Sequence, residues 1–125
     1  MNRAVNATRV LHREAPLGNS PSGSPIRYVA TLESGARTLF VAEQLLEPGQ
    51  AVPRHTHEVE EVLTFLSGQG EATCGDERHE VGEGVSLVIP PGVVHGFRAS
   101  GDGPLKVLVI FAGNRFAATT AVENG

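Results

Sequence analysis

Two runs of sequence decide the fold: GQAVPRHTHEVEEVLTFLSG at 49–68 and GVSLVIPPGVVH at 84–95. Both runs alternate apolar, strand-like residues with glycines and prolines that mark turns. Among these residues stand three histidines and one glutamate, namely His55, His57, Glu61 and His95. Imidazole and carboxylate groups are ordinary ligands of divalent transition metals. The two runs therefore predict a metal site inside a small β-barrel.

The spacing of these four residues sets conditions on the fold. On a strand, His55 and His57 point to the same side with Cα atoms about 6.5 Å apart, so both imidazoles can reach one ion. Glu61 has the same parity, but a straight strand would carry it about 13 Å past His57. We therefore expect the chain to turn at 58–60 and return as a neighbouring strand. His95 comes from a distant segment and must also point inward.

Short apolar runs recur along the chain, separated by turns rich in glycine, proline, serine and aspartate. We expect strands at 26–32, 37–46, 62–66, 71–74, 78–81, 85–89, 93–99 and 105–111. No stretch carries a sustained helical period with caps. Strands at intervals of about 8–12 residues predict an all-β sandwich or closed barrel.

At 125 residues the chain has the length of one domain. Residues 1–25 are predicted to form an N-terminal arm and a loop or linker rich in proline, glycine and serine. Residues 26–113 are predicted to form the barrel. Residues 114–125 are predicted to form a tail that is either a last helical turn or disordered.

Composition excludes several classes of function. Ten basic and fourteen acidic side chains give a net charge of −4 with no basic face, so we expect no nucleic acid partner and no anionic membrane partner. Cys74 is the only cysteine, so no intrachain disulfide can form. Neither a signal peptide nor an apolar run long enough to span a membrane is present, and a cytoplasmic location is the default expectation.

The first run resembles the first signature motif of the cupin superfamily. That motif is Gly, five residues, His-x-His, three or four residues, Glu, six residues, Gly. The chain matches it without a gap at Gly49, His55, His57, Glu61 and Gly68.

The second run is similar to the second cupin motif, which is Gly, five residues, Pro-x-Gly, two residues, His, three residues, Asn. The chain matches it at Gly84, Pro90, Gly92 and His95, but Ala99 stands at the Asn position. Fifteen residues separate the two motifs, a spacing that suits a compact single-domain member. The departure at Ala99 removes no metal ligand.

The resemblance implies a double-stranded β-helix, or jelly-roll cupin barrel, of two antiparallel sheets. It also implies one divalent transition metal, held by His55, His57, Glu61 and His95, and a homodimer. Fe, Mn, Ni, Zn and Cu all accept such donors, so sequence does not choose the metal. Cupins include oxygenases, isomerases, decarboxylases, storage proteins and regulatory domains, so the fold alone does not give the function.

Strand parity also predicts the residues around the metal. Leu63 and Phe65 share a side with Glu61, and Phe97 shares a side with His95. On the last strand, Val109 and Phe111 face inward if Lys106 faces solvent. These five residues predict a mostly apolar pocket, although plain core packing is an alternative reading for them. The parity of Glu43 and Gln44 stays ambiguous.

An open metal position in an apolar pocket favours a metalloenzyme that acts on a small organic molecule. The expected chemistry is dioxygenase-like, with the metal as Lewis acid and template and Glu61 as proton acceptor. Sugar-nucleotide epimerases need a separate acid and base and cationic groups for phosphate, and no such inward cluster is found. The alternative is a small-molecule binding or sensing module without turnover, so catalysis itself is left open.

Overall fold

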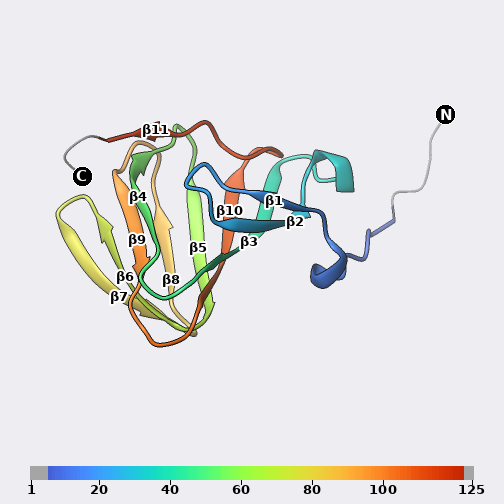
Figure 1. The fold of residues 1–125 in the computed structure, drawn as a ribbon. Helices are drawn as coiled ribbons and strands as arrows, with labels where there is room; N and C mark the ends of the chain where they lie inside the picture. Colours follow the sequence, from blue (N-terminus) through green and yellow to red (C-terminus); the bar gives the residue numbers. More distant parts are fainter. Residues whose placement is uncertain (1–5, 123–125) are drawn as a thin grey trace.

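The computed structural model describes residues 6–122, which form a jelly roll of two facing antiparallel sheets (Figure 1). The first sheet has the order β1 (Leu17–Asn19), β2 (Pro25–Ala30), β3 (Leu39–Leu46), β10 (Leu105–Ala112), β5 (Glu61–Ser67) and β8 (Ser86–Ile89). The second has the order β11 (Thr120–Ala121), β4 (Ala51–Thr56), β9 (His95–Ala99), β6 (Gln69–Cys74) and β7 (Glu77–Gly82). The two helical segments among the described residues, His12–Glu14 and Leu32–Ser34, are single 3-10 turns. The all-β jelly-roll prediction is confirmed.

Alternating burial explains why the central strands form. In β10, every second residue from Leu105 to Phe111 is buried. The same alternation runs through β3, whose eight residues all pair with β10. A period of two places one row of side chains inside the barrel and the other row outside. The register of the first sheet is therefore set by its inward-facing apolar row.

Aromatic side chains fill the space between the sheets. Phe40, Phe65 and Phe111 are at most 1% exposed. Phe65 on β5 meets Phe97 on β9 edge to face, with ring centroids 5.7 Å apart, and so joins the two sheets. Each such buried ring contributes about 1.5–3 kcal/mol of transfer free energy, so these rings anchor the barrel around the site.

The N-terminal segment differs from the predicted loop. Residues 16–25 contain β1, which pairs with β2, so the first sheet begins at Leu17 rather than at residue 26. The turn between these strands is held by the Ser20 N–H, which donates to the Ser24 carbonyl, and by hydroxyl contacts among its serines. Sequence composition predicted a loop or linker, whereas local side-chain hydrogen bonds make part of this stretch a structured hairpin turn. Residues 1–5 of the predicted arm lie outside the described residues.

The C-terminal segment is neither helical nor free of structure in its described part. Thr120 and Ala121 form β11, which pairs with β4. Phe116 packs against Phe40 and Phe111. Residues 123–125 lie outside the described range. In the described residues, no helix is long and apolar enough to cross a membrane.

Candidate metal centre

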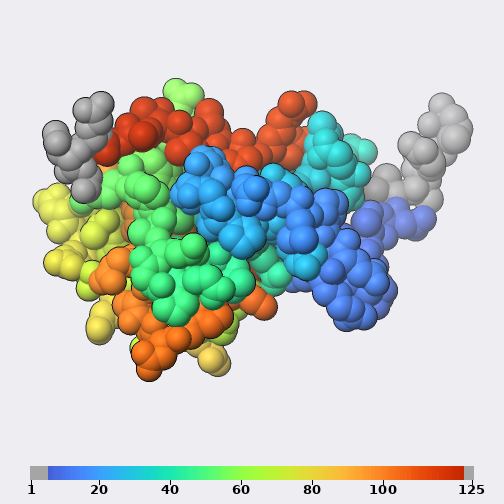
Figure 2. Space-filling view, viewed as in Figure 1, coloured from blue at the N-terminus to red at the C-terminus, as the bar shows by residue number. Residues whose placement is uncertain are grey.

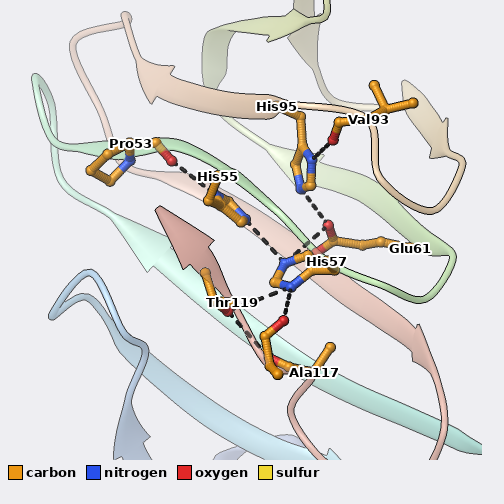
Figure 3. A network of polar contacts seen from close by, with 9 residues as sticks. Pro53, His55, His57, Glu61, Val93, His95, Ala117 and Thr119 are labelled. Atoms are coloured by element: carbon orange, nitrogen blue, oxygen red, sulfur yellow. Dashed lines mark hydrogen bonds and ion pairs between the residues drawn. The ribbon is translucent and has the colours of Figure 1, made fainter. Parts of the chain in front are cut away.

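The four predicted ligands come from both sheets and meet at one point (Figure 3). His55 lies in β4, His57 directly follows that strand, and His95 begins β9. His55 and His95 stand opposite each other in the ladder between β4 and β9. Glu61 begins β5 of the other sheet, because the chain turns between His57 and Glu61 as the spacing required. The four ligand atoms all lie within 4.8 Å of one another.

Local backbone structure brings β4 close to β9 beside the histidines. The ladder between these strands shifts register between Val52 and His55. A Cβ on Gly96, next to His95, would lie only 2.7 Å from the Val52 carbonyl oxygen. The absence of a side chain at Gly96 therefore allows the close approach that sets His55 beside His95.

Each histidine is fixed by a backbone carbonyl. The Nδ1 atoms lie 2.7–2.9 Å from carbonyl oxygens, in the pairs His55 with Pro53, His57 with Ala118, and His95 with Val93. A carbonyl oxygen only accepts, so each Nδ1 carries the proton and each Nε2 presents a lone pair. This is the arrangement that orients metal-bound histidines in proteins.

The inward atoms repel one another in the absence of a cation. The Nε2 atoms of His55 and His57 are 3.0 Å apart, and both face each other as acceptors. Glu61 Oε1 lies 2.6 Å from His95 Nε2 and 3.7 Å from His57 Nε2.

Two of these atoms also lack a hydrogen-bond partner. Glu61 Oε1 and His95 Nε2 are sealed from solvent, and their short contact does not have hydrogen-bond geometry within the described residues. A buried polar atom without a partner is costly. Three lone pairs and a carboxylate oxygen aimed at one point therefore fit a divalent transition metal.

Burial and the neighbouring carboxylate shift the pKa values of His55 and His95 in opposite directions. Burial is the main reason that the pKa of His55 is lowered, and the nearby His95 and His57 lower it further. Burial also acts to lower the pKa of His95, but contacts with Glu61 and the Val93 carbonyl outweigh it and raise that pKa above its ordinary value. The site thus keeps His55 neutral and lets a proton on His95 compete with a metal.

A cavity of about 150 Å³ opens over the centre. The lining includes three of the ligands, His55, His57 and Glu61, and two of the five residues named from strand parity, Phe97 and Val109. Leu63, Phe65 and Phe111, the other predicted pocket residues, are at most 1% exposed core residues and are not among the lining residues. Of these three, Phe111 packs against the centre, with its ring centroid 4.8 Å from that of His57.

Several lining residues were not predicted from the sequence. They come from the N-terminal turn, from β3 and from the C-terminal segment: Ser20, Pro21, Ser22, Gln44, Phe116, Thr119 and Ala121. Figure 2 shows the N-terminal segment, in blue, lying beside the C-terminal segment, in red. The alternation Phe40, Ala42, Gln44, Leu46 could have shown that Gln44 faces inward. The two terminal segments carry no such signal.

Other candidate groups lie outside the centre. Glu43 points away from the barrel interior, and its Oε2 atom forms a hydrogen bond of 2.8 Å with His12 Nδ1. Cys74 is half-buried opposite His95 in the ladder, but it is not part of the ligand cluster. Burial, followed by the charges of Glu77 and Glu61, raises the pKa of the Cys74 thiol. This cysteine therefore stays a protonated thiol.

The sequence profile of the cupin domain family matches residues 42–111, which include all four ligands. The chain belongs to this family. An uncharacterized protein from Methanocaldococcus jannaschii is 35% identical over 69 residues, which cover 54% of this chain and 55% of that protein. Protein SchB from Streptomyces halstedii is 30% identical over 86 residues, covering 67% of this chain and 62% of SchB. The matches thus span less than two thirds of these relatives' lengths.

Solved structures share the fold across nearly the whole chain. The polyketide cyclase RemF from Streptomyces resistomycificus superposes with a TM-score of 0.81 at 24% identity, covering 96% of this chain and 88% of RemF. Bacillus subtilis oxalate decarboxylase, in a structure whose name refers to its Mn(II) centres, gives 0.80 at 22% identity, covering 97% of this chain and 34% of the enzyme. At these identities the likeness shows the fold alone.

Proposed function

We propose that this protein is a metal-dependent enzyme that converts a small organic molecule in the cavity, with dioxygenase-type oxidation as its reaction class. The metal is one divalent transition ion among Fe, Mn, Ni, Zn and Cu. The observation that carries the proposal is the convergence of four buried donor atoms, two of them without a hydrogen-bond partner among the described residues, beside a cavity that His55, His57 and Glu61 line.

The chain's own residues have distinct roles in this proposal. His55, His57 and His95 hold the ion through their Nε2 atoms, with ring orientations fixed by backbone carbonyls. The bound metal would supply Lewis acidity and a template for substrate binding. Val109 and Phe97 exclude water and orient an apolar substrate. Glu61 accepts a proton from the substrate, since it is the one carboxylate among the residues that line this cavity.

The structural neighbours support an organic substrate in general terms. One is named as a polyketide cyclase and the other as an oxalate decarboxylase. Neither name specifies an oxidation with oxygen. A test must therefore measure substrate conversion as well as oxygen consumption.

The test begins with elemental analysis of protein purified without an affinity tag. Oxygen uptake and substrate loss are then followed with phenols and diketones, with His57→Ala as the control. We expect stoichiometric metal and conversion that His57→Ala abolishes. Conversion without oxygen uptake would replace the dioxygenase assignment by a non-oxidative one. A metal-loaded protein that converts none of these compounds would contradict the enzyme proposal.

A second candidate is a binding module without turnover. One observation favours it: among the described residues that line the cavity, Glu61, His55 and His57 are the carboxylate and imidazole groups, and all three belong to the ligand set, while Arg54 is the one further charged residue. Thermal-shift screening distinguishes the two functions. A binding module is stabilised by a ligand that mass spectrometry recovers unchanged, whereas an enzyme returns a product.

A further inference from the structure

A buried amide stands in an otherwise apolar row of β3. Phe40, Ala42 and Leu46 face the barrel interior and are at most 1% exposed. Gln44 faces the same way and is 4% exposed. Burying an amide costs free energy unless its polar atoms are hydrogen-bonded, so we consider the partners of both the amide nitrogen and the amide oxygen.

Serine hydroxyls hold the nitrogen of this amide. Gln44 Nε2 donates to Ser24 Oγ at 2.5 Å and to Ser20 Oγ at 3.2 Å. Ser22 Oγ lies 2.9 Å from Ser20 Oγ, and these serines form the turn between β1 and β2. We call Ser20, Ser22, Ser24 and Gln44 the serine–glutamine cluster. Both N–H groups of the Gln44 amide donate hydrogen bonds within this cluster, and this fixes the direction of the amide carbonyl.

The carbonyl oxygen of Gln44 has no hydrogen-bond partner among the described residues. This Oε1 atom is nevertheless not among the polar atoms sealed from solvent within residues 6–122. Gln44 is also one of the residues that line the cavity over the metal centre. Gln44 therefore carries an accessible acceptor and lines the same cavity as His55, His57 and Glu61.

The acceptor and the metal centre lie far apart along the barrel. Glu61 pairs with Phe111, and Phe111 pairs with Phe40. Gln44 is four residues beyond Phe40 on β3, a distance of about 13 Å along an extended strand. Besides these two polar ends, the cavity is lined largely by apolar side chains, with Arg54 and Thr119 as further polar members; the apolar ones include Val52, Phe97, Val109 and Phe116.

We infer that Gln44 determines ligand specificity: its amide hydrogen-bonds a hydroxyl at the far end of an elongated, largely apolar ligand whose other end carries an oxygen facing the metal centre. This inference rests on the proposed function only in placing an organic ligand in the cavity; it holds whether or not the ligand is converted. Two polar ends separated by an apolar middle define the substrate class. The serine–glutamine cluster serves to keep the amide aimed at the ligand.

The test compares two probes that differ at one end. The diol 2,6-dihydroxynaphthalene carries a hydroxyl at each end of a two-ring skeleton, whereas 2-naphthol lacks the second hydroxyl. Binding of each to zinc-loaded protein is measured by calorimetry, so that no turnover is needed. A hydroxyl both donates and accepts hydrogen bonds, so the diol can bond the Gln44 amide whichever of its polar atoms faces the ligand. The variant is Gln44→Met, which keeps the length of the side chain and removes its polar atoms.

We expect the wild-type protein to prefer the diol about 5–10-fold, as one hydrogen bond with a buried partner allows. Gln44→Met should reduce the preference to less than about twofold and leave 2-naphthol affinity unchanged. Ser24→Ala is the matched control, because it breaks the same contact with the turn while Ser20 still holds the amide; it should keep most of the preference.

Three results would overturn the inference. The first is equal affinity of the wild-type protein for both probes. The second is no binding of either probe. The third is that Gln44→Met and Ser24→Ala each lose affinity for both probes to the same extent. The last result would show that Gln44 only anchors the turn. If Gln44→Met fails to fold, the wild-type comparison and Ser24→Ala still decide the question. An absence of turnover contradicts the proposed enzyme but leaves the diol preference intact, so the two failures are distinguishable.

Discussion

The imidazole of His57 donates its Nδ1 proton to the carbonyl oxygen of Ala118, 61 residues further along the chain, at 2.9 Å. The same C-terminal segment places Phe116 with its ring centroid 6.5 Å from that of His57 and pairs β11 with β4. A segment outside both sequence motifs therefore orients a ligand of the metal centre.

Removing this segment should weaken metal binding without unfolding the barrel. A chain that ends at Arg115 loses the Ala118 carbonyl, so the His57 ring is free to turn. We expect metal affinity to fall about 10–100-fold, as for other hydrogen-bond partners of metal-bound histidines. Competition with a chelator measures the change, and circular dichroism checks the fold.

Two further chains serve as controls for this truncation. A chain that ends at Val122 keeps β11 and should bind metal as the full chain does. Phe116→Ala keeps the Ala118 carbonyl and should lose less affinity than the truncation. If the chain ending at Arg115 bound metal with unchanged affinity, Ala118 would have no role in orienting His57.

The ligand assignment itself is tested by His57→Ala. Losing one of four donors should lower metal affinity by more than about 100-fold, because the loss exceeds that of a supporting contact. The strands close the barrel without this residue, so the fold should persist. Elemental analysis gives the metal content, and His79→Ala, at a partly exposed histidine of β7 outside the ligand cluster, should leave it unchanged. Stoichiometric metal in His57→Ala would contradict the site.

The sequence predicted the parts of the site that follow from local geometry. His55 and His57 share a strand face by parity, and the turn before Glu61 was required by distance, so the ligand cluster could be predicted from spacing. The contribution of Ala118 could not, because it comes from a backbone carbonyl, and every residue has one. Its position depends on where the C-terminal segment packs.

The serine-rich turn shows a second limit of sequence reasoning. The stretch 16–25 has the composition of a linker, and composition does not reveal that its hydroxyls bond one another and Gln44. Such contacts exist only once β2 and β3 are paired. Burial of Gln44, in contrast, follows from its place in the alternating row of β3.

Metal binding should release a proton at mildly acidic pH. In the metal-free protein, burial acts to lower the pKa of His95, but Glu61 and the Val93 carbonyl raise it above the ordinary value of 6.5. At pH 6.5 more than half of the His95 side chains therefore carry a proton that the metal must displace. Proton release should shrink, and metal affinity should rise, as pH increases through the raised pKa.

Calorimetry in two buffers of different ionisation enthalpy counts the protons released. We expect a release that falls as pH rises above 6.5, with the affinity levelling off once His95 is neutral. A proton count that is zero at pH 6.5, or that grows as pH rises from there, would contradict the assignment of His95 as a ligand that carries a proton in the metal-free protein.

Two motif glycines should differ in their contribution to stability. Gly49 and Gly68 have nearly the same backbone angle, with φ of 85° and 87°. A Cβ at Gly49 would meet nothing within 4 Å, whereas a Cβ at Gly68 would collide with the Pro104 carbonyl oxygen and lie 2.8 Å from Leu105 Cα. Gly49→Ala should thus lower the free energy of unfolding by about 1–2 kcal/mol, the cost of a left-handed backbone alone. Gly68→Ala should cost at least about 3 kcal/mol, since overpacking adds to that strain. Urea unfolding of both variants measures the difference, and equal losses would show that β5 and β10 do not approach each other as closely as this turn requires.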